Sequence, residues 1–103
     1  MINVKVMMNR MVKIKLLGVF RRAYGSGEVS LKIKDSVQLR EIIQRLAASS
    51  EDFRRVLIDP ELESPLPNAV ILINGKDISA LNGLDTPITC GDEIVLIPVI
   101  HGG

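Results

Sequence analysis

The chain has 103 residues, enough for one domain and too few for a catalytic domain joined to a separate binding domain. Hydrophobic residues make up 47% of the sequence and aromatic residues 3%, so we expect an aliphatic core and no base-stacking platform for nucleic acid. The net charge of +1 gives little long-range attraction to nucleic acid or an anionic membrane, and one cysteine excludes an internal disulfide.

The first twenty residues are apolar enough to raise the question of a secretion signal. Charged and polar residues interrupt them before an apolar segment of signal-peptide length forms; these are Lys5, Asn9, Arg10, Lys13 and Lys15. No stretch reaches the roughly 18 apolar residues that cross a bilayer. We therefore expect a cytoplasmic protein. Residues 1–10 are interpreted either as an extra edge strand, because apolar residues alternate there, or as a mis-assigned start before Met11.

Two alternating runs predict an antiparallel hairpin near the N-terminus. Their apolar members are Val12, Ile14, Leu16, Val29, Leu31 and Ile33, and lysines lie between several of them. The Gly25-Ser26-Gly27 segment between the runs accepts positive φ angles, so we expect a long loop there.

The periodicity changes at Asp35-Ser36, either of which is expected to cap a helix. One apolar stripe follows, made of Leu39, Ile42, Ile43, Leu46 and Ala47. Ser49 and Ser50 are expected to end this helix and to begin a long connection. Phe53, Val56 and Leu57 predict one more short helical turn within it.

The last third predicts two further strands. Residues 69–73 form a continuous apolar run, expected to be a buried strand, and Asn74-Gly75 predicts a tight turn after it. A loop-rich stretch follows over residues 79–89, and the final strand is expected over residues 93–97. Pro98 lacks a backbone donor, so pairing should weaken there and the chain should leave the sheet near its edge.

This element order predicts an α+β roll in which one main helix covers one face of a mixed sheet. The domain is expected over residues 11–98, after the extension of residues 1–10. Residues 99–103 are expected to form a flexible tail.

The two glycines at the end of the sequence, Gly102 and Gly103, are its most informative feature. They arise by chance in about one chain in two hundred, and the alternative to a function is a solvated tail. A terminal carboxylate must be activated, commonly by adenylation with ATP, before its acyl carbon can be transferred. Residues without a Cβ let the chain enter a narrow channel and bring that carbon to its reaction partner.

Three segments together give a fairly specific family pattern: VKIKLLGVFRRAYG from Val12, VILINGKDI from Val70, and LNGLDTPITCGDEIVLIPVIHGG from Leu81. The pattern resembles the MoaD and ThiS sulfur carriers and the related ubiquitin-like modifiers of archaea and eukaryotes. It covers essentially all of residues 11–103.

The resemblance implies a ubiquitin-like β-grasp fold, ββαββ, and a protein that is a substrate of other enzymes and no catalyst itself. A MoeB-type enzyme would use ATP to adenylate Gly103, which would become a thiocarboxylate, and the chain would hold no cofactor. In the MoaD branch the tail enters the large, MoaE-type subunit of molybdopterin synthase and donates sulfur. That inserted tail corresponds here to Pro98, Val99, Ile100, His101, Gly102 and Gly103.

The MoaD role is the first expectation, although a MoaD tail resembles Phe-Pro-Pro-Val-Ala-Gly-Gly and this chain lacks the Phe and the second Pro. A modifier used in tRNA thiolation or in conjugation to lysines is the alternative. A β-grasp interaction domain with an unactivated tail is the second alternative.

Other reactive residues have simpler interpretations. Cys90 has no His or second Cys nearby in the sequence and is expected to be a small turn or core residue. Asp92 and Glu93 are expected to serve the turn and the start of the last strand. His101 is expected to contact a channel or solvent, and one His with one Cys predicts no metal site.

Overall fold

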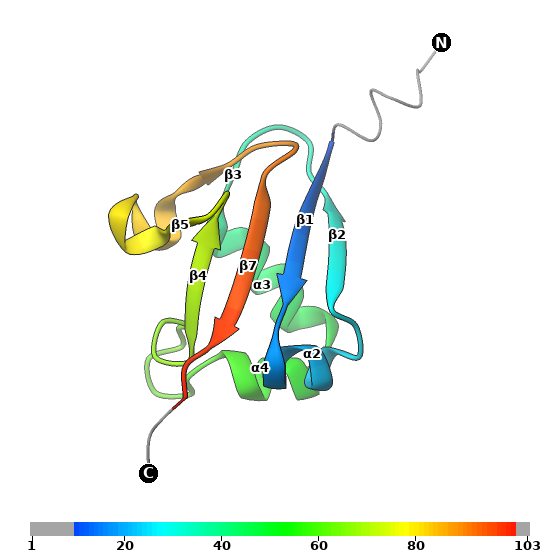
Figure 1. The fold of residues 1–103 in the computed structure, drawn as a ribbon, viewed down its shortest axis with the longest axis vertical. Coiled ribbons are helices and arrows are strands. Elements are labelled where there is room, and N and C mark those ends of the chain that lie inside the picture. The colour runs from blue at the N-terminus through cyan, green and yellow to red at the C-terminus, as the bar shows by residue number, and fades with distance from the viewer. Residues whose placement is uncertain (1–9, 101–103) are drawn as a thin grey trace.

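The computed structural model describes residues 10–100, which form a five-stranded mixed sheet with helices on one of its faces (Figure 1). The strand order is β2-β1-β7-β4-β5, with β1 and β7 parallel and the other neighbours antiparallel. The strands are β1 (Met11–Leu16), β2 (Glu28–Lys32), β4 (Ala69–Ile73), β5 (Lys76–Asp77) and β7 (Glu93–Pro98). The predicted α+β class is confirmed.

Within residues 10–100, the structure also contains three α-helices and a small second sheet. The helices are α2 (Gly18–Tyr24), α3 (Leu39–Ser49) and α4 (Glu51–Leu57). The second sheet pairs β3 (Val37–Gln38) with β6 (Pro87–Ile88), and short 3-10 turns η1 (Ile78–Ala80) and η2 (Gly83–Asp85) precede β6. In Figure 1 the helices all lie behind the sheet, so its other face is uncovered by them.

The core lies between the sheet and α3. All five residues of the predicted helical stripe, from Leu39 to Ala47, are buried. The alternating residues of β1 and β7 that point toward α3 are buried as well; these are Val12, Ile14, Leu16, Ile94 and Leu96. Period-two strands and a period-3.6 helix therefore bury one face each against the other, as the sequence predicts.

The predicted hairpin forms, with Val12 opposite Leu31 and Ile14 opposite Val29. The expected long loop is wrong in part, because most of that connection is helix α2. The helix places Phe20 and Tyr24 four residues apart on one side, where both rings contact Phe53 of α4 edge-on, at centroid distances of 6.0 and 5.2 Å. These are all the aromatic residues of the chain, and they join α2 to α4.

The predicted cap of α3 is also wrong, since neither Asp35 nor Ser36 occupies the capping position. The helix is preceded by Gln38, whose side chain makes no capping bond. Instead the Leu39 amide donates to the carbonyl oxygen of Thr86 at 2.9 Å, because the β3–β6 pairing brings that carbonyl to the helix start. The short helical turn predicted at Phe53 is confirmed as α4, with Ser50 as its cap.

The last hairpin confirms the predicted turn after β4. Asn74 and Gly75 adopt positive φ angles of 50° and 86° and reverse the chain into β5. However, β4 is buried on one face only, because Val70 on the other face is 37% exposed. The expectation of a buried strand is therefore confirmed for the inner face and wrong for the uncovered face.

The predicted departure of the chain at a sheet edge is wrong, because β7 is the central strand. Pro98 pairs with Ala69, and Val99 still donates its amide to the Asn68 carbonyl oxygen at 3.0 Å. Successive amides of a strand point to opposite sides, so the Pro98 nitrogen faces the β1 side. There β1 has already ended at Leu16, and no ladder bond is lost.

Candidate functional site

The end of β7 leads toward the predicted reacting group and is held by both neighbouring strands. On one side the Leu17 amide donates to the Leu96 carbonyl oxygen at 3.2 Å, and on the other Val99 donates to Asn68. Beyond these bonds Ile100 is 89% exposed. The strand is thus fixed up to Val99, so the ordered body presents whatever follows from a defined position.

The predicted residues His101, Gly102 and Gly103 lie outside the described residues. Of the other members of the predicted tail, Pro98 ends the central strand, Val99 is hydrogen-bonded just beyond it, and Ile100 is exposed. The roles expected of the last three residues therefore remain predictions.

Gly18 is a part of this site that the sequence analysis missed. Its φ angle is +54°, and a Cβ added to it would lie 2.9 Å from Cγ of Pro98. Both facts favour glycine, since L side chains rarely adopt this conformation and the proline ring occupies the space. The close approach packs the start of α2 against the end of β7. A glycine just after an alternating strand was the available signal, but its partner is distant in sequence.

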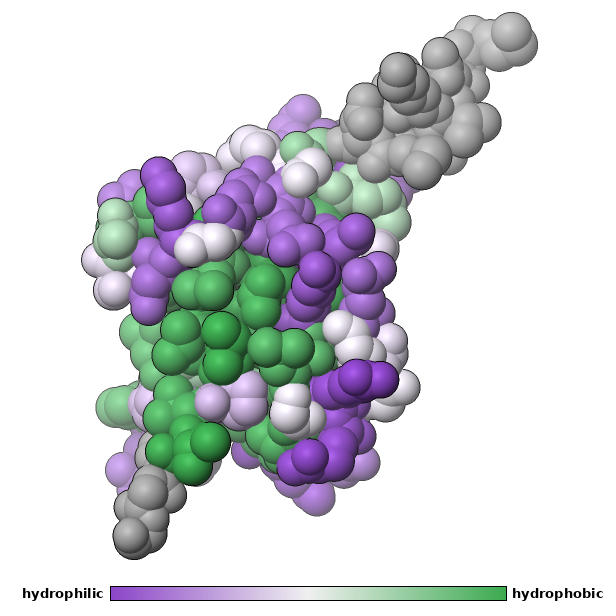
Figure 2. All heavy atoms as spheres, viewed as in Figure 1, coloured by the Kyte–Doolittle hydropathy of each residue, from purple (hydrophilic) through white to green (hydrophobic). Residues whose placement is uncertain are grey.

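The uncovered face of the sheet is apolar next to the end of β7. We call it the apolar sheet face, and its residues are Leu17, Val70, Leu72, Val95, Ile97 and Val99. Val70 lies opposite Ile97 and Leu72 opposite Val95, so the side chains form adjacent cross-strand pairs. Figure 2 shows a green surface on this face that extends toward the C-terminal end of β7.

Charged residues border the apolar sheet face on the β1 side. Lys13 and Lys15 are exposed there, and the Lys15 ammonium lies 3.5 Å from a carboxylate oxygen of Glu93. Figure 2 shows this part of the same face as hydrophilic. An apolar patch with a polar border is typical of a protein-binding surface.

The Asp92 carboxylate makes hydrogen bonds at the turn before β7, as the sequence predicts. Its Oδ2 accepts from the Thr89 amide at 2.8 Å and its Oδ1 from the Asn74 side-chain amide at 2.9 Å. The side-chain Oδ1 of Asn74 in turn accepts from the Glu93 amide at 2.9 Å. These bonds join the turns at one end of β4 and β7, far from the tail, and place no acid–base pair at the site.

Cys90 is partly buried against the core in the same turn region, which agrees with the structural role expected for it. Asp77 caps η1, away from the site, and its pKa is lowered mainly by a hydrogen bond from the Ser79 amide and also by one from the Ser79 hydroxyl.

Among residues 10–100, no group of three or more His, Cys, Asp or Glu side chains is placed to hold a metal. No helix in this part of the chain is long and apolar enough to span a membrane.

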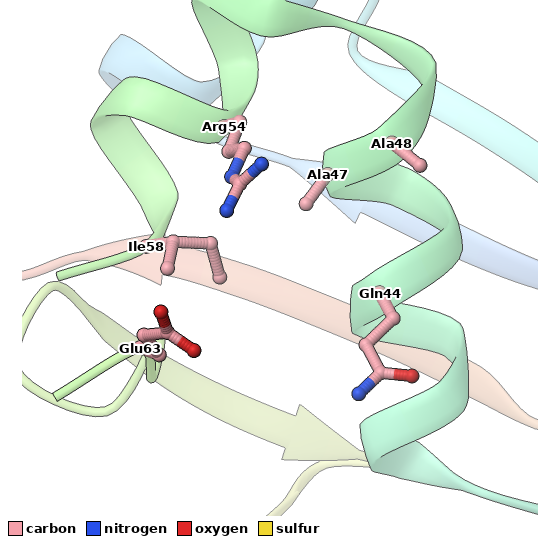
Figure 3. Close-up of a pocket in the computed structure, with 6 residues that line it drawn as sticks. All are labelled: Gln44, Ala47, Ala48, Arg54, Ile58 and Glu63. Carbon is pink, nitrogen blue, oxygen red and sulfur yellow. The ribbon is translucent and has the colours of Figure 1, made fainter. Parts of the chain in front are cut away.

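A separate cavity of about 280 Å³ lies on the helical side of the molecule. Figure 3 shows Gln44 and Ala47 of α3 on one side of it, and Arg54, Ile58 and Glu63 on the other. The residues that line this cavity include one cation, one anion and three apolar side chains, but no Ser, Thr, Cys, Lys or His. The cavity therefore offers no nucleophile for acyl transfer.

A model of one protein family matches most of this chain. The ThiS family model matches residues 14–103. The chain belongs to the ThiS family. The family comprises ubiquitin-like sulfur carriers and modifiers, so the resemblance inferred from the sequence is confirmed.

Three proteins illustrate what this ThiS-family chain is similar to. It is 23% identical over 93 residues to small archaeal modifier protein 3 of Haloferax volcanii, covering 89% of this chain and 98% of that protein. The solution structure of small archaeal modifier protein 1 from Methanosarcina acetivorans is 28% identical, with a TM-score of 0.77 over 90% of this chain and 96% of that one.

A chain of the Amycolatopsis orientalis BexX/CysO complex is 23% identical, with a TM-score of 0.65 over 89% of this chain and 99% of that one. The likeness to such structures shows that the fold is the ubiquitin-like β-grasp.

Proposed function

We propose that this protein is a carrier whose Gly103 carboxylate is its reacting group. The observation that carries the proposal is the position of the Gly-Gly sequence, a few residues beyond a central strand that is hydrogen-bonded up to Leu96 on the β1 side and up to Val99 on the β4 side. The family match, which continues to residue 103, supports it. The carboxylate carbon is unhindered because neither Gly102 nor Gly103 has a Cβ.

The chemistry begins with attack of a Gly103 carboxylate oxygen on the α-phosphorus of ATP, which releases pyrophosphate and forms an acyl-adenylate. Sulfur from a donor at the oxidation level of sulfide then attacks the acyl carbon, and AMP leaves. The product is a thiocarboxylate, and no net oxidation or reduction occurs at the carbon. A MoeB-type partner enzyme binds the ATP and performs both steps, so this chain is the substrate.

The activating enzyme binds the apolar sheet face in this proposal. Ordering the tail in a channel costs on the order of 1 to 2 kcal/mol per residue, so affinity must also come from the folded body. The apolar sheet face ends where β7 ends, and Val99 belongs to both the face and the tail. An enzyme that closes around the tail therefore meets this surface first.

Conjugation to proteins is the fate that we favour for the activated acyl group. A lysine ε-amine attacks the acyl carbon, the activating group leaves, and an isopeptide bond forms. The relative matched over 89% of this chain is a modifier protein, and the tail lacks the Phe and second Pro expected of a MoaD protein. Donation of sulfur in molybdopterin synthesis, with a MoaE-type partner, is the second candidate, supported by the sequence resemblance to MoaD.

The direct test is incubation of the chain with its activating enzyme, ATP and a sulfide donor, followed by intact mass measurement. We expect a mass gain equal to the replacement of one oxygen by one sulfur. Deleting Gly103, or adding one alanine after it, should abolish the gain and change the free energy of unfolding by less than about 0.5 kcal/mol. Full activity in either variant, or no gain in the parent chain, would contradict the proposal.

Conjugation is tested in cells by searching for modified lysines. No Lys or Arg follows Lys76, so trypsin leaves the segment from Asp77 to Gly103 on the target and not a short Gly-Gly remnant. A search for the long remnant should find conjugates, and these should be lost in the Gly103 deletion. Thiocarboxylate formation without conjugates would favour the molybdopterin candidate. If neither a thiocarboxylate nor a conjugate formed, the chain would be better explained as an interaction domain with an unactivated tail.

A further inference from the structure

A cluster of cations surrounds a pocket at the end of the sheet where β1 begins. The pocket has a volume of about 480 Å³. Its lining consists of Arg10, Lys32, Ile33, Lys34 and Arg45, so four of the five residues are cationic and none is acidic. We call the four cations the basic cluster. In Figure 1 this end of the sheet lies opposite the end at which β7 terminates.

The backbone that carries the basic cluster is tied together by hydrogen bonds. Nη1 of Arg45 donates to the Lys32 carbonyl oxygen at 2.9 Å, which joins α3 to the end of β2. The Ile33 amide donates to the Arg10 carbonyl oxygen at 2.9 Å, and the Ile33 side chain is buried. The cluster therefore combines three separate parts of the chain in a fixed arrangement.

The ion pairs present among residues 10–100 do not neutralise the basic cluster. They join Lys15 to Glu93 and Arg40 to Asp85. The preceding segment, residues 1–9, contains Lys5 but no Asp or Glu, so it adds no side-chain carboxylate. Like charges held together repel one another, and a bound anion removes that repulsion.

We propose that the basic cluster binds phosphate groups, beyond the carrier function proposed above. The planar guanidinium groups of Arg10 and Arg45 can each hold a phosphate through two parallel bonds, and lysines add compact charges. One Arg45 nitrogen already holds Lys32, which orients its guanidinium plane. No aromatic ring is available for base stacking, because all three rings of the chain pack together at α2 and α4.

Phosphates fit this pocket better than the carboxylates of an acidic peptide. A nucleic-acid duplex carries one negative charge per roughly 1.7 Å of its axis. An extended acidic peptide carries at most one per roughly 3.3 Å. Four cations around one pocket match the denser charge, which either a free polyphosphate or an RNA backbone can supply.

The experiment is an amide NMR titration of the full, isotope-labelled chain with three probes: tripolyphosphate, a short RNA duplex and a hexaglutamate peptide. We expect tripolyphosphate or the duplex to shift the amides of Arg10, Ile33, Lys34 and Arg45. The double variant Lys32→Gln with Lys34→Gln should weaken that binding about tenfold. For the duplex, it should also lower the slope of log affinity against log salt by about two.

The matched control is the double variant Arg54→Gln with Arg55→Gln, which removes two charges from α4. It should change the affinity by less than about twofold, because α4 lies at the other end of the molecule. Tighter binding of tripolyphosphate or of the duplex identifies the source of the phosphate, and both support the proposal. Equal weakening in both double variants, equally tight binding of hexaglutamate, or no shift in the named amides would overturn it.

Discussion

The two faces of the central sheet carry similar side chains in different surroundings. On the inner face Ile94 and Leu96 of β7 are fully buried beneath the helices. On the outer face Val95 and Ile97 of the same strand form part of the apolar sheet face, which no helix covers. Burial against α3 explains the apolar inner residues, but it does not explain an apolar patch on the face that no helix covers.

The outer face is not apolar throughout. Its β1 side carries Lys13 and Lys15, which is the usual composition of a solvated strand. The apolar part lies mainly over β4 and β7. These strands pair at the end of the sheet where the tail begins, with Ala69 opposite Pro98. The comparison indicates that the inner face determines stability and that the outer face beside the tail is left open for the binding proposed above.

The largest expected loss of stability comes from the inner face. Leu96→Ala should lower the free energy of unfolding by about 3 kcal/mol, because it leaves a cavity under α3. Ile97→Ala, one residue along, should lower it clearly less, because that side chain is already partly exposed. Denaturant unfolding measures both, and equal losses would contradict the division between the two faces.

A smaller loss is expected where β7 meets α2. Gly18→Ala forces a Cβ into the left-handed region and against the Pro98 ring, and should cost about 2 to 3 kcal/mol. Gly83→Ala is the matched control, because its φ angle is +58° and nothing lies within 4 Å of the added Cβ. It should cost only about 1 kcal/mol. A cost for Gly18→Ala no greater than for Gly83→Ala would show that the proline contact is unimportant.

Periodicity was sufficient to predict the four longer strands and α3, because those patterns depend only on neighbouring residues. The two-residue strands β3, β5 and β6 are too short to show a period and were missed. The features that were missed depend on distant partners. Helix α2 is supported by contacts with Phe53, the start of α3 by the Thr86 carbonyl, and Gly18 by Pro98. A continuous apolar run also cannot distinguish a strand covered on both faces from one with an exposed apolar face, which is why the exposure of Val70 was missed.

The predicted site shows the same division. The Gly-Gly sequence can be recognised directly because it is local. The surface beside it requires β4 and β7 to be adjacent, and these strands are separated in the sequence by residues 74–92. The basic cluster likewise required the structure, because Lys32 and Lys34 give no sign in the sequence that Arg10 and Arg45 lie next to them.

The smallest effect on stability, and a large one on activation, is expected from the outer face. Val70→Ser should change the free energy of unfolding by about 1 kcal/mol or less, because Val70 is already 37% exposed. It should reduce the rate of adenylation at limiting activating enzyme about tenfold, because it places a hydroxyl at the centre of the proposed contact.

Leu62→Ser provides the matched control for Val70→Ser. Leu62 is 69% exposed and lies outside the apolar sheet face, so the substitution removes an exposed apolar side chain without touching the proposed contact. The Leu62 variant should be adenylated at the parent rate. If both variants are adenylated at that rate while the Gly103 deletion is inactive, the tail is still the reacting group, and the enzyme binds the body elsewhere than on the apolar sheet face.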